Sequence, residues 1–164
     1  MDNINSPPNL IINNETEILI LGTRPGEKSL EKGNYYAKKG NRFWKIMEDI
    51  YPELESKEYD EKINFLRANK IGLWDVLRYH EGRGSLDKNI KNEQPNDFKN
   101  LFNHHKNIKK VLFNGLKDPK KFFNKHKCYC PNNIKPKPLP STSGMNTKYS
   151  IQDLIKDWKE AIRE

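Results

Sequence analysis

Three short apolar runs recur along the chain, each followed by glycine or polar residues. They are EILILG at residues 17–22, IGLWDVL at residues 71–77 and KKVLFNG at residues 109–115. Apolar runs of this length without polar alternation are typical of strands buried on both faces of a parallel sheet. We therefore expect three buried parallel strands.

The segments between these runs have the spacing of amphipathic helices. The apolar positions are Phe43, Ile46, Met47 and Ile50, then Ile63 and Leu66, then Phe98, Leu101 and Phe102. Strands that alternate with helices along a chain favour an α/β domain, in which a parallel sheet lies between two layers of helices. The pattern predicts a three-layer α/β/α fold.

Two further helices are predicted near the C-terminus. Asp118 followed by Pro119 is typical of an N-cap and a first helical position, and this helix should run to about residue 125. Ser150 with Asp153 forms a variant of the capping box, ahead of an apolar stripe. The stripe consists of Ile151, Leu154, Ile155, Trp158 and Ile162. Residues 131–140 contain four prolines, which suit an extended segment at a sheet edge.

The length of 164 residues fits one domain, with residues 1–14 as a loosely ordered extension. No stretch has the roughly 18 to 20 apolar residues of a membrane helix, and residues 1–10 lack the order of a secretory signal. We expect a cytoplasmic monomer without membrane contact. Cys128 and Cys130 are too close for an unstrained disulfide and too few for a four-cysteine metal site, so we expect no metal cofactor.

The net charge of +8 is unevenly distributed. Residues 99–137 contain eleven lysines and a single acidic residue, Asp118. Such a block suits the neutralisation of nucleic-acid phosphates, although a lysine-rich surface also keeps a protein in solution. Charge alone leaves both interpretations open.

Candidate chemistry follows the strands, because ligands of open parallel sheets bind outside the carboxyl ends of the strands. After the first strand comes the loop Gly22-Thr23-Arg24-Pro25-Gly26, in which glycines let backbone N–H groups approach a ligand. A plain strand-to-helix turn would have the same composition.

Aromatic rings and a carboxamide come next, as Tyr35-Tyr36 and Asn41-Arg42-Phe43-Trp44. Rings can sandwich an extruded base, and a carboxamide can read its edge or hold a water. Asn41 also fits an N-cap of the helix that follows, and Phe43 and Trp44 also fit the core.

A loop rich in small residues follows the last extended segment. Its N–H and O–H groups suit phosphate binding, and Met145 suits insertion between base steps. The residues are Ser141, Thr142, Ser143, Gly144 and Met145. Loops of this composition also commonly precede a helix without any binding role.

The ordered set of these motifs resembles the hypoxanthine-DNA glycosylase branch of the uracil-DNA glycosylase superfamily, over roughly residues 17–160. Three further matching motifs are Gly72-Leu73-Trp74-Asp75-Val76-Leu77, Gly84-Ser85-Leu86-Asp87 and Phe113-Asn114-Gly115. The resemblance implies a four-stranded parallel sheet, no cofactor, DNA as the partner, Asn41 as the catalytic residue and a serine-rich loop that pinches the DNA backbone.

The chain departs from this pattern in its first loop. Mismatch-specific relatives place a catalytic asparagine at the position of Arg24, and the hypoxanthine branch usually has an aromatic residue there. The resemblance predicts a monofunctional glycosylase that flips hypoxanthine, uracil or a modified pyrimidine out of DNA and hydrolyses its N-glycosidic bond.

We assign expected roles on this basis. Tyr36 and Phe43 stack on the base, Asn41 orients the base or a water, and Arg24 stabilises the departing base anion. Asp75 activates the water or faces the sugar cation. The remaining residues expected to contact the base are Gly22, Thr23, Pro25, Gly26, Trp74 and Asn114. Packing or turn formation explains Trp74, Asp75 and Asn114 equally well.

Two alternatives belong to other classes. A non-catalytic binder of DNA or of a modified base would keep the fold and lose the chemistry. A nucleotide-handling α/β enzyme would use the first loop for phosphate, but the sequence contains neither a P-loop nor the spaced glycines of a dinucleotide site.

Overall fold

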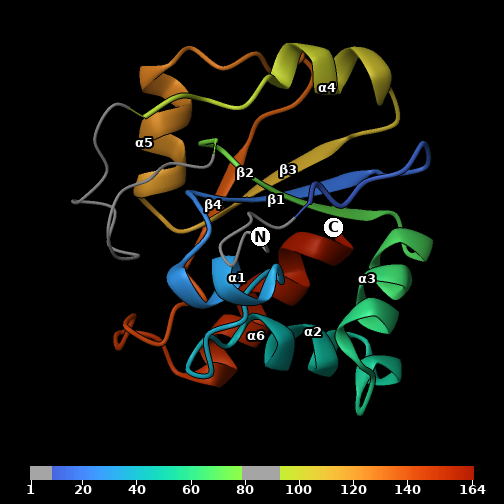
Figure 1. Ribbon diagram of the computed structural model, residues 1–164, viewed down its shortest axis with the longest axis vertical. Helices are drawn as coiled ribbons and strands as arrows, with labels where there is room; N and C mark the ends of the chain where they lie inside the picture. The colour runs from blue at the N-terminus through green and yellow to red at the C-terminus, as the bar shows by residue number, and fades with distance from the viewer. Residues whose placement is uncertain (1–8, 79–92) are drawn as a thin grey trace, which may run out of the picture.

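A central parallel sheet organises the protein (Figure 1). The computed structural model describes residues 9–78 and 93–164. Within them the strand order is β2-β1-β3-β4 and every strand pair is parallel. The strands are β1 (Ile18–Gly22), β2 (Ile71–Asp75), β3 (Lys110–Asn114) and β4 (Lys137–Leu139). The three predicted strands and the proline-rich edge segment are confirmed; the motif at residues 84–87 lies outside the described residues.

Helices cover both faces of this sheet, which confirms the three-layer α/β/α prediction (Figure 1). The helices α4 and α5 cover one face, and α2, α3 and α6 cover the other. The helices are α1 (Glu27–Lys32), α2 (Phe43–Ile50), the 3-10 turn η1 (Pro52–Leu54), α3 (Tyr59–Ala68), α4 (Phe98–His104), α5 (Asp118–Lys125) and α6 (Ile151–Arg163).

Alternating side chains of β1 pack into two separate apolar cores, because successive residues of a strand point to opposite faces. Ile20 packs with residues of α2, α3 and α6. Leu19 and Leu21 pack with residues of α4 and α5. All three side chains are fully buried. The first strand is thus the hydrophobic centre of the sheet, and its carboxyl end is held rigidly.

The predicted caps of the two last helices have different outcomes. Ser150 accepts a hydrogen bond from the Asp153 N–H at 3.1 Å, and the Asp153 carboxylate accepts one from the Ser150 N–H at 3.2 Å, so the capping box is confirmed. The helix at Asp118 begins one residue earlier than predicted, since Lys117 occupies the cap position and Asp118 is already helical.

Residues 9–14, the described part of the N-terminal segment, differ from one prediction. We expected residues 1–14 to form a loosely ordered extension, but Ile11 is 5% exposed and its backbone exchanges hydrogen bonds with Leu73 at 3.0 and 2.9 Å. Residues near Ile11 therefore extend the sheet edge beside β2. No helix within the two described ranges is long and apolar enough to cross a membrane.

Trp158 connects the core to the segment that enters the serine-rich loop. Its side chain is fully buried, and its indole N–H donates to the Pro140 carbonyl at 3.0 Å.

We expect Trp158→Ala to lower the free energy of unfolding by about 3–5 kcal/mol, because it leaves a large cavity and an unsatisfied carbonyl. Chemical denaturation measures this. Tyr129→Ala, at a side chain that is 45% exposed, is the control and should cost less than about 1 kcal/mol; equal losses would contradict the assignment of Trp158 to the core.

Candidate active site

A pocket of about 610 Å³ opens at the carboxyl ends of the strands. Three loops build its walls, namely residues 22–29, residues 35–41 and residues 141–145. Asp75 at the end of β2 and Asn114 at the end of β3 contribute side chains between them. The pocket lies where an open parallel sheet is expected to bind its ligand.

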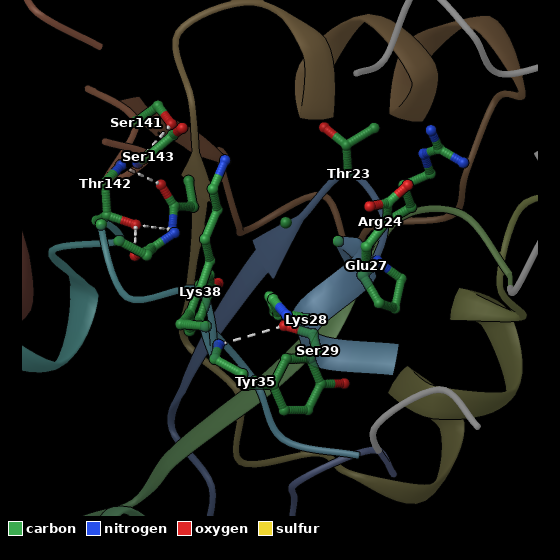
Figure 2. A pocket seen from close by; sticks show the side chains of 18 of the residues that line it. Thr23, Arg24, Glu27, Lys28, Ser29, Tyr35, Lys38, Ser141, Thr142 and Ser143 are labelled. Carbon is green, nitrogen blue, oxygen red and sulfur yellow. Dashed lines mark hydrogen bonds between the residues drawn. The ribbon is translucent and has the colours of Figure 1, made fainter. Parts of the chain in front are cut away.

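The first loop and the serine-rich loop face each other across this pocket (Figure 2). Thr23, Arg24 and Glu27 lie on one side in this view, and the serine-rich loop lies on the other. The side chain of Lys38 extends between the two. The predicted first-loop residues Gly22, Thr23, Arg24, Pro25 and Gly26 all line the pocket.

A buried carboxylate and a buried phenol hydroxyl meet beside Gly22. Asp75 pairs with Gly22 in the sheet register and is 6% exposed. A β-carbon on Gly22 would lie 2.7 Å from the Asp75 carboxylate and 3.7 Å from the Tyr36 hydroxyl. A side chain at position 22 would therefore collide with the Asp75 carboxylate, whereas the Tyr36 hydroxyl would be at ordinary contact distance.

The Tyr36 hydroxyl is a buried donor that no hydrogen bond satisfies within the described part of the chain. Burial, and to a lesser extent the negative charge of Asp75, raise the pKa of Tyr36 above its ordinary value, and the nearby Asn114 amide offsets only part of this rise. The phenol therefore stays protonated at neutral pH, and its hydroxyl is a buried donor beneath the pocket wall. Its backbone φ of 56° lies in the left-handed region, which costs a non-glycine residue roughly 1–2 kcal/mol.

Phe43 supports Tyr36 from behind and does not reach the pocket. Its ring lies 4.1 Å from the Tyr36 ring, centroid to centroid, at an interplanar angle of 31°. Its side chain is fully buried, and it also packs edge-on against Trp158. The prediction that Phe43 stacks on a base is therefore wrong: the first residue of α2 points into the core, and only Tyr36 of this stacked pair presents a ring to the pocket.

The carboxamide of Asn41 has a fixed orientation. Its Oδ1 accepts a hydrogen bond from the Phe43 backbone N–H at 2.9 Å and another from the Thr142 hydroxyl at 2.9 Å. A backbone N–H can only donate, so the atom that faces it must be the oxygen. Asn41 thus serves the start of α2, as a capping residue would, and at the same time lines the pocket.

Thr142 joins this amide to the end of β3. Its hydroxyl accepts from Asn114 Nδ2 at 2.9 Å, and its backbone N–H donates to Asn114 Oδ1 at 2.9 Å. The residue is fully buried. The prediction that Thr142 grips a phosphate is therefore wrong, because its hydroxyl is already committed to two side-chain amides.

The two serines on either side of Thr142 keep a free donor capacity. Ser141 Oγ accepts from the Ser143 N–H at 3.1 Å, and Ser143 Oγ accepts from the Met145 N–H at 3.2 Å. A hydroxyl that accepts from the backbone can still donate its own proton, and phosphate oxygens are acceptors. Met145 is 65% exposed at the rim of the pocket.

A close backbone contact places the serine-rich loop against the loop that carries Asn41. A β-carbon on Gly144 would lie 2.6 Å from the Gly40 carbonyl oxygen, so only glycine fits at this crossing. Gly144 itself does not line the pocket. Its contribution is to let the two loops touch.

Arg42 fastens the serine-rich loop, a role that no sequence pattern indicated. Its guanidinium donates to the carbonyls of Tyr149 at 2.7 Å, Asn146 at 2.8 Å and Ser143 at 3.3 Å. Its backbone N–H also donates to the Thr142 carbonyl at 2.8 Å. Four backbone carbonyls of one irregular loop thus accept hydrogen bonds from a single residue beside Asn41, and one of them, that of Ser143, also accepts from the Asn146 N–H at 3.0 Å.

Trp74 lies elsewhere than predicted. It lines a separate hollow together with residues of α4 such as His104, and its ring packs edge-on against Phe98 at 5.2 Å. Neighbouring residues of a strand point to opposite faces, so Asp75 enters the pocket and Trp74 cannot. The expectation that Trp74 contacts a base is wrong.

The lysines at the pocket come from outside the predicted basic block. Lys28, Lys32, Lys38 and Lys39 line it, and all four are exposed. Two lysines of the block sit at the opposite end of β3 and have other partners. Lys109 forms an ion pair with Glu17 at 3.2 Å, and Lys110 donates to the carbonyls of Ala161 and Glu164 at the end of α6.

Comparison with known proteins agrees with this architecture. Residues 11–163 match the sequence profile described as "Uracil DNA glycosylase superfamily". The chain belongs to the uracil DNA glycosylase superfamily. A protein of Methanosarcina barkeri named hypoxanthine DNA glycosylase is 39% identical over 158 residues, covering 96% of each chain.

Two further relatives come from Methanosarcina acetivorans. A protein also named hypoxanthine DNA glycosylase is 33% identical over 158 residues, covering 93% of this chain and 94% of the relative. A solution NMR structure of a protein provisionally assigned as a uracil DNA glycosylase has a TM-score of 0.76 and 31% identity, covering 95% of this chain and 94% of that one. The resemblance inferred from the motifs is confirmed at the level of the superfamily.

Loss of the Arg42 guanidinium should loosen the serine-rich loop of this superfamily member without unfolding the domain. We expect Arg42→Met to lower the free energy of unfolding by about 1–3 kcal/mol, since several carbonyls lose their donor. Backbone amides of residues 141–149 should exchange with solvent faster than in the parent protein, as measured by hydrogen exchange. Arg67→Met is the control, since it removes a guanidinium that donates to Asn64 of its own helix. Unchanged exchange in the Arg42 variant would show that the loop keeps its structure without the guanidinium.

Proposed function

We propose that this protein is a monofunctional DNA glycosylase that extrudes a deaminated base, hypoxanthine in the first place, and hydrolyses its N-glycosidic bond. The observation that carries the proposal is the amide of Asn41, which lines the pocket of a uracil DNA glycosylase superfamily member and whose oxygen is occupied, so that only its N–H donors are free. Two relatives named hypoxanthine DNA glycosylase, at 39% and 33% identity over nearly the whole chain, support hypoxanthine as the base.

The pocket suits an extruded base, because a glycosylase must take its target out of the helix before it can reach the glycosidic bond. Tyr36 offers a ring for stacking, held from behind by Phe43. Met145 stands exposed at the rim, where an apolar side chain can replace the extruded base in the stack. The free donor capacity of the Ser141 and Ser143 hydroxyls supports a role in binding the adjoining phosphates.

Cleavage of the bond develops negative charge on the base and positive charge on the sugar, so catalysis requires opposite dipoles on the two sides. Asn41 offers N–H donors to the base anion, and the protonated, uncharged Tyr36 hydroxyl lies buried beside them. Asp75 supplies the buried carboxylate for the sugar cation or the attacking water. Arg24, in the first loop, adds positive charge on the pocket wall opposite the serine-rich loop.

This arrangement favours one of the two roles expected for Asn41. A side chain that activates water needs a free acceptor, and both lone pairs of Asn41 Oδ1 are already used. Its free groups are donors, which suit a base carbonyl. We therefore assign the base to Asn41 and the water to Asp75.

Excision of a defined base tests the proposed function. Otherwise identical oligonucleotides carrying hypoxanthine, uracil, a modified pyrimidine or no lesion are incubated with the protein and then treated with alkali, which cleaves abasic sites. We expect strand cleavage with hypoxanthine and none with undamaged DNA. Tight binding of lesion DNA without any alkali-labile site would instead identify a non-catalytic binder.

Replacement of Asn41 should abolish most base release while the domain stays folded. We expect Asn41→Ala and Asn41→Asp each to lower the single-turnover excision rate by about 100-fold or more, because both remove the amide donors. Aspartate still accepts from the Phe43 N–H, so Asn41→Asp should lose at most about 1 kcal/mol of helix capping. Thermal melts serve as the control, and rates close to the parent protein in both folded variants would refute the catalytic role.

DNA binding should depend on the lysines at the pocket more than on those at the far end of β3. We expect Lys38→Ala with Lys39→Ala to weaken binding and to reduce the slope of log affinity against log salt by roughly one to two, because each removed lysine leaves one phosphate without its cation. Lys106→Ala with Lys109→Ala removes the same charge and is the matched control. Fluorescence anisotropy at several salt concentrations measures both, and equal slopes in the two variants would place the DNA elsewhere.

A further inference from the structure

Thr142 is a buried residue whose polar groups are all engaged. Its hydroxyl accepts from Asn114 Nδ2 and donates to Asn41 Oδ1, each at 2.9 Å. Its backbone N–H donates to Asn114 Oδ1 at 2.9 Å, and its carbonyl accepts from the Arg42 N–H at 2.8 Å. None of its surface is exposed. Buried polar groups this completely paired are rigid, because every movement leaves a donor or an acceptor unsatisfied.

The direction of each hydrogen bond in this chain is determined. The backbone N–H of Thr142 can only donate, which places the oxygen of Asn114 against it and leaves Nδ2 as the donor to Thr142 Oγ1. The hydroxyl proton of Thr142 is then available for Asn41 Oδ1. The backbone N–H of Phe43 holds the same oxygen independently.

One consequence concerns what the pocket presents to a base. With both lone pairs of Oδ1 occupied, Asn41 can offer the base only its two N–H donors. A donor matches the carbonyl of hypoxanthine or uracil and faces the exocyclic amino group of adenine or cytosine without forming a bond. Orientation of the amide thus distinguishes a deaminated base from its parent.

We propose that Thr142 is a positioning and specificity-determining residue: its hydroxyl locks the amides of Asn41 and Asn114 so that the pocket donates to base carbonyls. This inference rests on the proposed glycosylase function and names the residue that sets its selectivity. Thr142 acts through the two asparagines and does not itself touch the reacting atoms. Because it lies between Ser141 and Ser143, the same loop positions the amide and faces the DNA backbone.

The test compares two substitutions at one position. Thr142→Val keeps the shape and removes the hydroxyl, whereas Thr142→Ser keeps the hydroxyl. We expect Thr142→Val to lower the single-turnover rate on hypoxanthine DNA by about 10- to 100-fold with the DNA dissociation constant changed less than about threefold, and Thr142→Ser to restore most of the rate. Equal rates for valine and the parent protein, or a serine variant as slow as valine, would overturn the inference.

A double-mutant cycle separates positioning from a general structural effect. If Thr142 acts through Asn41, then Thr142→Val should cost little further rate in the Asn41→Ala background. An equal loss in both backgrounds would show that the hydroxyl acts independently of the amide and would overturn the inference. Thermal melts identify any variant whose folded population limits the rate.

Side-chain amide resonances of the free protein supply a readout that needs no activity. We expect the NH₂ signals of Asn41 and Asn114 to shift in Thr142→Val and to stay near their positions in Thr142→Ser. Unmoved signals in the valine variant would overturn the lock even if the parent protein were active. Absence of excision by the parent protein would refute the proposed function, and the resonances would then still decide whether Thr142 orders the amides.

Discussion

The attachment of residues 141–149 to the start of α2 is the constraint on which the site depends. This segment contains no helix or strand, and its internal turns satisfy only some of its backbone carbonyls, so others need donors from elsewhere. The guanidinium of Arg42 satisfies three of them, and the backbone of Arg42 satisfies a fourth. Each such hydrogen bond contributes about 0.5–1.5 kcal/mol, and together these part-buried bonds hold the loop in one position. The neighbouring residue, Asn41, is fixed by the same contact.

Periodicity and composition predicted the layers and most of the pocket. Apolar runs identified the buried strands, and the rule for open parallel sheets placed the site at their carboxyl ends. Asp75 and Asn114 were found because they end β2 and β3. These positions could be predicted because each depends on the order of apolar and polar residues within a short stretch of sequence.

The remaining features depend on long-range geometry that no local pattern contains. Phe43 and Trp74 were assigned to the pocket from proximity in sequence, but α2 turns Phe43 into the core and the pleat of β2 turns Trp74 to the other face. The bonds of Arg42 join residues more than 100 positions apart, and a charge count cannot show that Lys109 pairs with Glu17 far from the site. Lys38 and Lys39 come just before the predicted Asn41 motif in the sequence. Their position next to this motif was the one signal that could have identified them as pocket residues.

The electrostatics of the pocket explain why a neutral amide occupies position 41. Asp75 is a buried carboxylate near the Tyr36 hydroxyl, and a second carboxylate in the same pocket would repel it and raise the pKa of one of the two. It would also face the negative charge that develops on a departing base. An amide avoids both costs, because it donates without carrying charge and its oxygen can accept hydrogen bonds from the protein itself. The hydroxyl of Thr142 and the N–H of Phe43 donate these bonds. Neutrality and fixed orientation together let one small side chain serve the helix start, the serine-rich loop and the base at once.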